Sequence, residues 1–377
     1  MEKLITCTAA NVSTDDGIVL QGNGADQWSI TKKTLVGGVQ TGVELLIVDN
    51  GLMQITIILT RGMSVLDIQW NDIRIGWDSP VKQVVHPNFV NLEDQGGLGW
   101  LSGFNELMVR CGVAFAGHPG DDNGEFLTLH GRIGNLPASR VEVSFEEAPE
   151  PTIRVRGLVE EKRFKFGVFE LWTELATVVG SDKITIHDRL TNPSEYSQEY
   201  QLIYHTNFGR PFLEQDAQFV APVKTLAPLN EYAAEDLATF QRYLGPTSGY
   251  GEQVYCATML ADPQHWTTTM LHNADASLGV AVGYDVQTLP YFNLWKNTDT
   301  ERDGFVTGLE PATGFPYNRS VERAGGRVNK IGAGQSVDFS MSLQALTADG
   351  VAATNTAIQS LMGDRKTKLI ETLASEQ

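Results

Sequence analysis

Two histidines follow apolar segments of the chain, and glycine and arginine come soon after each of them. His130 lies in LTLHGRIGN, and His205 lies in YQLIYHTNFGR. Histidine exchanges protons near neutral pH, and a glycine beside it lets a ligand or a neighbouring backbone approach closely. A lone histidine commonly just satisfies a buried carbonyl group. Two in the same setting favour a chemical site over two structural corners.

Two carboxylates complete a set that is suited to proton transfer. Glu310 lies in GLEPATGFPYN, which is apolar and rich in proline and glycine. Such surroundings raise the pKa of a carboxyl group and suit a general base, although an ordinary acid at a strand end has the same appearance. Glu252, in GYGEQVYC, is either a second polar group of the site or a residue that terminates a sheet.

Further polar residues near these segments are candidates for substrate binding. Arg110 follows the glycine-rich stretch GLGWLSGFNELMV, and its guanidinium needs either ligand oxygens or a structural salt bridge. Asn207, Arg132 and Lys296 stand close to the histidines or to Trp295. Aromatic residues that could stack on a sugar ring, or simply fill the core, are Trp100, Phe104, Tyr204, Phe208, Tyr250, Phe292 and Trp295.

Several classes of site lack their sequence signals. The chain has no phosphate-binding glycine loop, dinucleotide fingerprint or nucleophile elbow. The histidines and glutamates show no short ligand spacing such as His-x-His, so a metal site built from His130, His205, Glu252 and Glu310 is the alternative to direct acid–base catalysis. The expectation is that no metal or other cofactor is needed.

Charge and cysteine content limit the partners and the compartment. With 46 acidic and 28 basic residues the formal net charge is −18, which opposes binding to nucleic acid. The three cysteines are far apart and fit neither a disulfide framework nor a zinc ribbon. The N-terminus lacks the apolar core of a secretory signal, and no run is long enough to span a membrane. A soluble, cytoplasmic protein is expected.

Most of the chain has the alternating pattern of antiparallel strands. Two β-rich runs flank Asp49-Asn50-Gly51, which predicts a hairpin, and long strands are expected between residues 152 and 194 and near residues 277 and 336. Helices are expected only over residues 230–244 and in a C-terminal tail over residues 352–374. No linker interrupts the pattern, so the chain is expected to be all-β, with residues 1–377 forming one large antiparallel β-sandwich.

Taken in order, these segments resemble the aldose 1-epimerase (galactose mutarotase)-like superfamily, over roughly residues 40–345. The match is closest to a bacterial branch marked by Leu-His-Gly-Arg-Ile-x-Asn-x-Pro-Ala, which is Leu129 to Ala138 here. The resemblance implies a β-supersandwich that interconverts the anomers of a sugar. It also implies Glu310 as the base, His205 as the acid, and His130 and Arg110 as groups that hold the sugar.

The chain also departs from the mutarotase pattern. The family's His-Pro-Tyr-Phe-Asn-Leu motif is His-Thr-Asn-Phe-Gly-Arg from residue 205, and no aspartate stands where mutarotases bind sugar hydroxyls. Glu252 is the expected substitute, and Arg132 and Lys296 point to an anionic or atypical sugar. The expected protein is a monomer or homodimer acting on a small sugar. A metal-dependent sugar isomerase and a sugar-binding protein without turnover are the alternatives.

Overall fold

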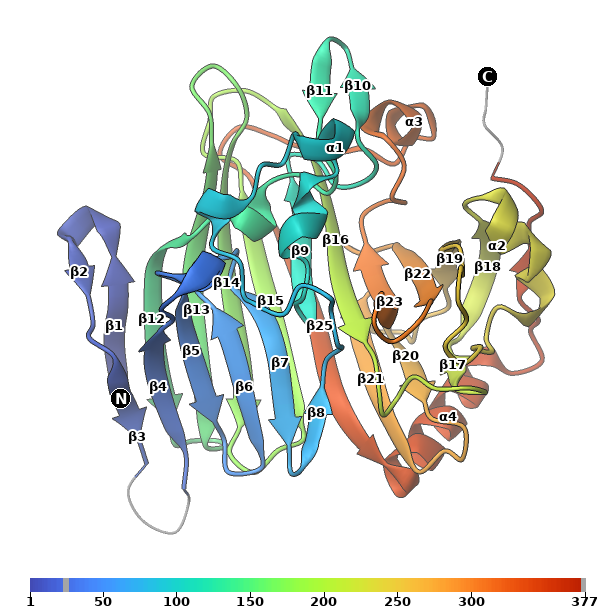
Figure 1. Cartoon of the computed structure of the whole chain (residues 1–377), viewed down its shortest axis with the longest axis horizontal. Coiled ribbons are helices and arrows are strands. Elements are labelled where there is room, and N and C mark those ends of the chain that lie inside the picture. Colours follow the sequence, from blue (N-terminus) through green and yellow to red (C-terminus); the bar gives the residue numbers. More distant parts are fainter. Residues whose placement is uncertain (23–26, 374–377) are drawn as a thin grey trace.

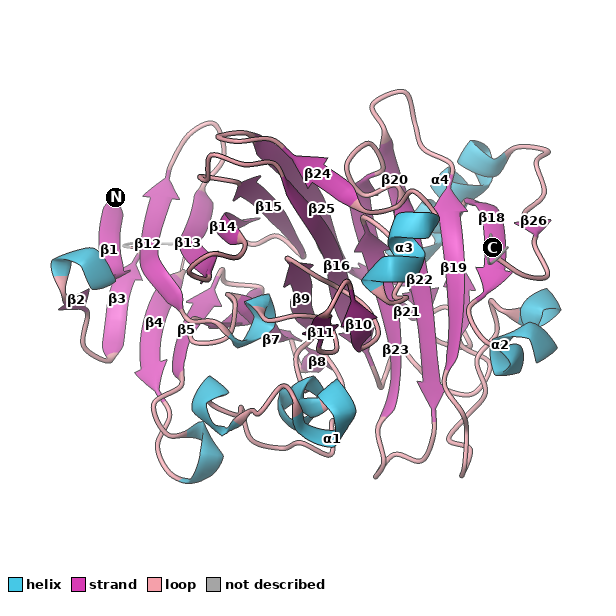
Figure 2. Cartoon of the chain, turned by 90° about the horizontal axis from the view of Figure 1, so that it is seen from above, coloured by secondary structure: helices cyan, strands magenta, loops and turns pink. Residues whose placement is uncertain are grey.

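A computed structural model describes residues 1–22 and 27–373 of the chain. Two large sheets face one another, and short helices and loops cover their ends (Figures 1 and 2). All strand pairs are antiparallel except one, between β18 and β26. The expectation of an all-β fold built on large antiparallel sheets with few short helices is therefore confirmed.

The first sheet has ten strands. In spatial order they are β17 (Gln218–Val220), β20 (Trp266–His272), β21 (Leu278–Asp285), β25 (Ser336–Thr347), β15 (Lys183–Thr191), β14 (Val168–Val178), β13 (Thr152–Lys162), β12 (Ala138–Glu146), β1 (Glu2–Cys7) and β2 (Val12–Ser13). The long strands predicted between residues 152 and 194 are β13, β14 and β15, and those predicted near residues 277 and 336 are β21 and β25.

The second sheet has fourteen strands, two of which pair beside the main path. The path is β26 (Lys368–Leu369), β18 (Val223–Pro228), β19 (Gln253–Met259), β22 (Tyr291–Thr298), β23 (Phe305–Ala312), β16 (Gln198–Phe208), β9 (Met108–Val113), β7 (Ser64–Trp70), β6 (Met53–Ile58), β5 (Glu44–Asp49), β4 (Ser29–Thr34) and β3 (Gly17–Gln21). Beside it, β24 (Asn329–Ile331) pairs with β16 and β8 (Ile73–Ile75) with β7, while β10 (Gly120–Asp122) and β11 (Glu125–Leu127) form a separate hairpin.

The predicted hairpin around Asn50 is present between β5 and β6. Gly51 has a φ of 90°, and the Asn50 side-chain oxygen accepts hydrogen bonds from the backbone N–H groups of Leu52 and Met53 at 2.9 and 2.7 Å. The amide nitrogen of Asn50 donates to the Thr177 hydroxyl at 2.7 Å. Because Thr177 belongs to the first sheet, this one side chain both closes the turn and ties the two sheets together.

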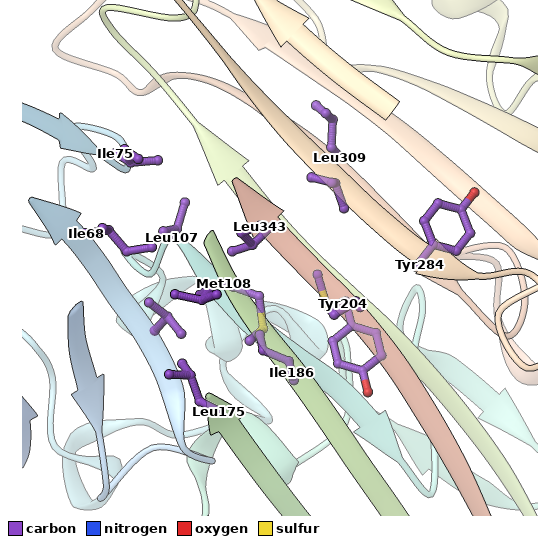
Figure 3. Packing of buried hydrophobic residues seen from close by; sticks show 14 of the residues in the cluster. Ile68, Ile75, Leu107, Met108, Leu175, Ile186, Tyr204, Tyr284, Leu309 and Leu343 are labelled. Atoms are coloured by element: carbon purple, nitrogen blue, oxygen red, sulfur yellow. The ribbon is translucent and has the colours of Figure 1, made fainter. Parts of the chain in front are cut away.

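The inner faces of the two sheets form the main hydrophobic core. Ile68 and Met108 from the second sheet meet Leu175, Ile186 and Leu343 from the first (Figure 3). Alternation places every second residue of a strand on this inner face. Burying one such aliphatic side chain contributes about 1.5–3 kcal/mol before the opposing loss of chain entropy.

Two central strands of the second sheet are buried on both faces. Residues 200–208 of β16 are all buried, and so is the whole of β23, whereas β15 alternates strictly between exposed and buried residues. One face of β16 and β23 packs against the first sheet. The other face lies under the segments that connect β8 to β9 and β11 to β12, and there it carries polar side chains.

The helices are shorter than the sequence predicts. The structure has α1 (Asp94–Gly97), α2 (Glu231–Glu235), α3 (Arg319–Ala324) and α4 (Ala348–Met362), besides six 3₁₀ turns. The helix predicted over residues 230–244 is only α2 and a 3₁₀ turn at Leu237–Thr239. The helix begins where the prediction places it, because the Asn230 side chain caps it by accepting a hydrogen bond from the backbone N–H of Ala233 at 2.8 Å.

The predicted C-terminal helical tail is also too long. Helix α4 ends at Met362, before Gly363, whose φ of 55° favours glycine, and the chain then forms β26 beside β18. Only Val351 and Ile358 of α4 are buried, and they pack against a small cluster on the first sheet. Because packing stabilises a helix only where its residues are buried, the helix does not extend further. Residue 374, the end of the predicted tail, lies outside the described residues. In the described ranges, no helix has the length and hydrophobicity to cross a membrane.

Candidate active site

The two residues predicted to transfer protons, His205 and Glu310, lie side by side. Strands β16 and β23 pair with Ile203 opposite Ala312 and Asn207 opposite Gly308, so His205 stands opposite Glu310. The distance from His205 Nε2 to Glu310 Oε1 is 3.1 Å, and the two residues are only 5% and 2% exposed. Strand pairing thus joins residues that are far apart in the sequence into one buried pair.

Asn207 fixes how the His205 ring carries its proton. The amide nitrogen of Asn207 donates to the carbonyl oxygens of Glu106 and His205 at 3.0 and 3.2 Å, which leaves its side-chain oxygen to face His205 Nδ1 at 2.7 Å. An amide oxygen only accepts hydrogen bonds, so Nδ1 must carry the hydrogen. In the neutral ring, Nε2 is therefore unprotonated on the side of Glu310. Asn207, predicted to bind substrate, instead orients the histidine from a fully buried position.

Burial makes the neutral forms of both residues the favoured ones. It raises the pKa of Glu310 well above its ordinary value, and the negative charge of Glu252 adds to this shift. It also lowers the pKa of His205 to about 4, although the hydrogen bond to Asn207 opposes the change. Both shifts favour a proton on Glu310 over one on His205 Nε2. Apart from its contact with His205 Nε2, Glu310 Oε1 has no polar partner among the described residues, so a ligand that enters the pair can bond to it.

His130 lies against the same pair, at the start of a tight turn. Its φ is 59°, and its ring meets those of Trp100 and His205 with centroids 4.9 and 5.5 Å apart. Its Nδ1 is buried without a partner in the described part of the chain. The pKa of His130 is well below its ordinary value, mainly because the residue is buried and secondly because His205 lies beside it. A neutral imidazole with a free nitrogen thus stands beside the pair.

The glycine after His130 serves the fold. A Cβ at Gly131 would lie 2.2 Å from the carbonyl oxygen of Phe115, and Gly131 forms a bridge with Gly112. The close approach that the sequence predicts at this glycine is therefore made by a neighbouring backbone, which holds the His130 turn against β9.

Three of the predicted aromatic residues surround His205. The rings of Phe104, Trp295 and Trp100 lie 5.2, 5.3 and 5.8 Å from it between centroids. Glu252 is exposed, and its Oε2 accepts from the Trp295 indole nitrogen at 2.9 Å, so the site reaches solvent on this side. Three of the other predicted aromatic residues belong to the core between the sheets: Tyr204, Phe208 and Phe292. The fourth, Tyr250, donates its hydroxyl hydrogen to the Gln253 side chain.

Two further residues of the site were missed by sequence reasoning. Asn293 stands opposite Glu310 on β22, is fully buried, and has no partner for either side-chain polar atom within residues 1–22 and 27–373. Gly308 leaves the space that the Glu310 carboxylate fills, because a Cβ there would come 2.3 Å from Oε1. Both lie two residues from a predicted site residue on the same strand, which is the spacing that shares a face.

Arg110 was predicted to bind the sugar, and the structure corrects this. Arg110 lies opposite Tyr204 on the inner face of the second sheet, whereas its neighbour Val109 lies opposite His205. Its Nη2 donates to Asp188 Oδ1 at 3.0 Å, and its Nη1 donates to the carbonyl oxygen of Met63 at 3.1 Å. The guanidinium therefore forms a structural ion pair with Asp188 between the two sheets. A structural salt bridge was the other possibility that the sequence left open for Arg110.

Lys296 and Arg132 also lie away from the pair. Lys296 follows Trp295 on β22 and so points to the opposite face, where its Nζ donates to the carbonyl oxygens of Phe240 and Arg242 at 3.2 and 2.8 Å. Its burial lowers its pKa to about 8. Arg132 follows the His130 turn and lines a different cavity. Neither charge stands beside the His205–Glu310 pair, so the basis for expecting an anionic sugar there is lost.

The donor set does not take the form of a metal site. Over the described residues, no three His, Cys, Asp or Glu side chains converge in a way that could hold a metal ion. His205, Glu310 and His130 are neighbours, but Glu252 reaches the group only through Trp295. The arrangement can accept a proton at one atom and deliver one at another.

Comparison with known proteins places the chain among related folds. A structure from Klebsiella pneumoniae, described as a "putative aldose 1-epimerase", is 40% identical with a TM-score of 0.97, and the match covers 100% of both chains. A galactose mutarotase-like protein from Clostridium acetobutylicum is 12% identical with a TM-score of 0.56 over 86% of this chain and 100% of that one. A galactose mutarotase related enzyme from Lactobacillus acidophilus is 14% identical with a TM-score of 0.53, over 81% and 98%.

The two more distant matches share the fold alone, and no curated protein matches the chain. The family match is to a group described as a domain of unknown function, DUF4432, and it covers residues 40–345. With its galactose mutarotase-like fold, the chain belongs to this DUF4432 family.

Proposed function

We propose that the protein is an aldose 1-epimerase-like isomerase that interconverts the anomers of a monosaccharide or sugar derivative. The observation that carries the proposal is the buried His205–Glu310 pair, with its reactive atoms 3.1 Å apart. Opening a cyclic hemiacetal requires one proton to leave the anomeric hydroxyl and another to reach the ring oxygen. Both oxygens are bonded to one carbon, so two adjacent groups suffice.

In the proposed reaction, the pair holds the same number of protons before and after ring opening. On substrate binding, the proton of Glu310 passes to His205 Nε2, which gives a carboxylate and an imidazolium. Glu310 then takes the proton of the anomeric hydroxyl while His205 protonates the ring oxygen, and the bond between the anomeric carbon and the ring oxygen breaks. The carbonyl group turns over, and the same transfers in reverse close the ring as the other anomer. Asn207 supports these steps by holding Nε2 toward Glu310.

The surrounding residues have complementary roles in this proposal. Trp295, Trp100 and Phe104 offer apolar faces for the sugar ring. His130 Nδ1 and the Asn293 amide, which lack protein partners among the described residues, bond sugar hydroxyl groups. Glu252 accepts a hydroxyl at the solvent side. Water-poor surroundings strengthen each of these contacts.

The test is anomer-resolved NMR with a panel of monosaccharides, together with binding calorimetry. We expect Glu310→Gln and His205→Asn each to lower the rate of anomer exchange by at least about a hundredfold, the usual loss for a missing acid or base. His187→Asn is the matched control, because His187 is an exposed histidine on β15, and its rate should equal that of the wild type.

Three other results would contradict the proposal. Near-full activity in either variant of the pair would remove the mechanism. Binding of sugars without any exchange by the wild type would indicate a sugar-binding protein. Loss of activity on chelation, with a stoichiometric metal in the purified protein, would favour the metal-dependent isomerase.

A further inference from the structure

A cavity lies on the side of the His130 turn away from the His205–Glu310 pair. Its volume is about 980 Å³, and it lies near the end of the sandwich that carries the β10–β11 hairpin, at the top of Figure 1. Its lining comes from residues 90–93, 114–115, 125–132, 161–169 and 194–199 and from Arg319. His205 and Glu310 are not among its lining residues. Within residues 127–132, His130 contacts the candidate active site and Arg132 lines this cavity.

Arg132 is the charged group that this cavity leaves without a partner. It is half-buried, and in the described residues it forms neither a hydrogen bond nor an ion pair. Three other cations of the lining are paired: Arg319 bonds Asp122 and Glu125, Arg163 lies 3.6 Å from Glu125, and Lys162 bonds Glu170. The fourth, Lys165, lies over the Phe164 ring. A guanidinium that has lost part of its hydration needs oxygen acceptors, and a ligand anion supplies them in the matching planar geometry.

Glu161 offers the complementary group from the wall of the cavity. It is 6% exposed, and its Oε2 accepts the backbone N–H groups of Val113 and Ala114 at 3.0 and 3.2 Å. Its Oε1 takes no hydrogen bond from the described part of the chain. Burial raises the pKa of this carboxyl group, while Arg132 and Arg163 oppose the change. A half-satisfied carboxylate beside an unpaired guanidinium suits a ligand that carries both an anionic group and a hydroxyl group.

The aromatic residues of the cavity match the remaining part of such a ligand. Phe126, Phe166 and Tyr196 line it and are 49%, 63% and 79% exposed. Exposed rings beside polar groups provide stacking faces for the apolar side of a sugar. In a chain with a net charge of −18, a cavity that presents an unpaired arginine is a local exception to the overall sign.

From these observations we propose that the cavity is a second ligand site, separate from the His205–Glu310 pair, for a sugar that bears one anionic group. Arg132 binds the anionic group, Glu161 Oε1 accepts a hydroxyl, and the aromatic residues pack on the ring. The anionic group is either a carboxylate or a phosphate, since Arg132 serves both. The site accounts for Arg132, which the proposed isomerase reaction does not use.

The experiment is titration calorimetry of the full chain with three probes: glucuronate, glucose 6-phosphate and neutral glucose. At least one anionic probe should bind, and Arg132→Ala should weaken that binding by at least about tenfold, the loss expected for a charge-assisted contact. Glu161→Gln, which can still accept the two backbone N–H groups, should weaken it less. The preferred probe identifies the anionic group as carboxylate or phosphate.

Two controls separate this site from the proposed active site. His205→Asn should bind the anionic probe as the wild type does, because the pair lies outside the cavity. Arg189→Ala removes an arginine that pairs with Asp338 on an exposed surface, and it should also bind normally. The proposal is overturned if Arg132→Ala weakens the binding of glucose as much as that of the anionic probes, if inorganic phosphate binds as well as glucose 6-phosphate, or if Arg132→Ala retains the affinity for the anionic probes while its unfolding temperature is unchanged.

Discussion

Two buried polar clusters lie on opposite faces of the second sheet, with β16 contributing to both, and they differ in how completely their hydrogen bonds are satisfied. On the inner face, Asp188 accepts from Arg110 and from the Tyr204 hydroxyl at 2.8 Å, and Arg110 bonds Thr173 and backbone carbonyls as well. On the outer face, Glu310 Oε1 meets only His205 Nε2, and both polar atoms of Asn293 lack hydrogen-bond partners in the described residues.

This difference in hydrogen bonding indicates a structural role for the inner cluster and a chemical role for the outer one. A buried charge that is fully paired resists any change in its protonation, because removing one partner strands the other. Buried neutral groups whose polar atoms lack hydrogen-bond partners in the protein alone can form those hydrogen bonds with a ligand. The Arg110–Asp188 cluster therefore fastens the two sheets, whereas the His205–Glu310 pair is suited to exchanging protons with a substrate.

The largest expected effect comes from breaking the inner cluster. Arg110→Met leaves Asp188 buried without its cation, so the free energy of unfolding should fall by about 3–5 kcal/mol, as measured by urea denaturation. The double variant Arg110→Met/Asp188→Leu should recover most of this loss, because no charge is then stranded. A loss below about 1 kcal/mol in the single variant would show that the cluster does not fasten the sheets.

The outer pair should instead reveal itself through pH. In the unfolded chain a histidine binds a proton as the pH falls below 6.5, whereas folded His205 stays neutral down to about 4. At this residue the unfolded state takes up more protons in this window, so the contribution of His205 to stability falls between pH 6.5 and 4, by up to about 3 kcal/mol, whereas the raised pKa of Glu310 contributes in the opposite direction. His205→Asn should lack this contribution in urea denaturation at pH 7 and 4.5. Equal losses in variant and wild type would show that His205 titrates normally.

Gly308 tests whether the position of the carboxylate matters. The added methyl group of Gly308→Ala would displace the Glu310 side chain, and we expect the rate of anomer exchange to fall about tenfold. Gly157→Ala is the matched control, because its Cβ would meet the flexible Met63 side chain in the core. The control should lower the unfolding temperature without lowering the rate per folded molecule. A rate for Gly308→Ala equal to that of the control would contradict the assignment.

The smallest effect is expected from Glu252 at the edge of the site. Its charge helps to raise the pKa of Glu310, so Glu252→Gln should shift the Glu310 limb of the pH–rate profile to lower pH, by less than about one unit because solvent screens an exposed charge. The glutamine oxygen still accepts from the Trp295 indole, which preserves the ring position. A shift toward higher pH would contradict this electrostatic role.

The sequence predicts the sheets well and singles out His205 and Glu310, which the structure brings together, but it does not predict which face each side chain takes. His205 and Glu310 stand out because polar residues are unusual within such apolar runs. Trp295 and Lys296 cannot share one face of a strand, since successive side chains alternate. That rule was available from the sequence, and it would have removed one of the two from the site.

Arg110 could not be assigned in the same way. Its partner Asp188 lies 78 residues away, and only the pairing of β9 with β16 shows that Val109, not Arg110, shares a face with His205. The helices were overextended for a related reason. Spaced apolar residues predict a helical stripe, but a helix persists only as far as neighbours bury that stripe, and those neighbours come from distant strands.

The pairing of β16 with β23 has a consequence for how this protein tolerates change. His205 meets Glu310 only because the two strands are aligned in one register. Deleting a single residue from β23 would turn its side chains over and present Leu309 or Pro311 to the histidine, while the hydrogen-bond ladder could re-form. Along these strands, substitutions are therefore graded in their effect, but a change of length by one residue replaces the His205–Glu310 contact with an apolar surface in a single step.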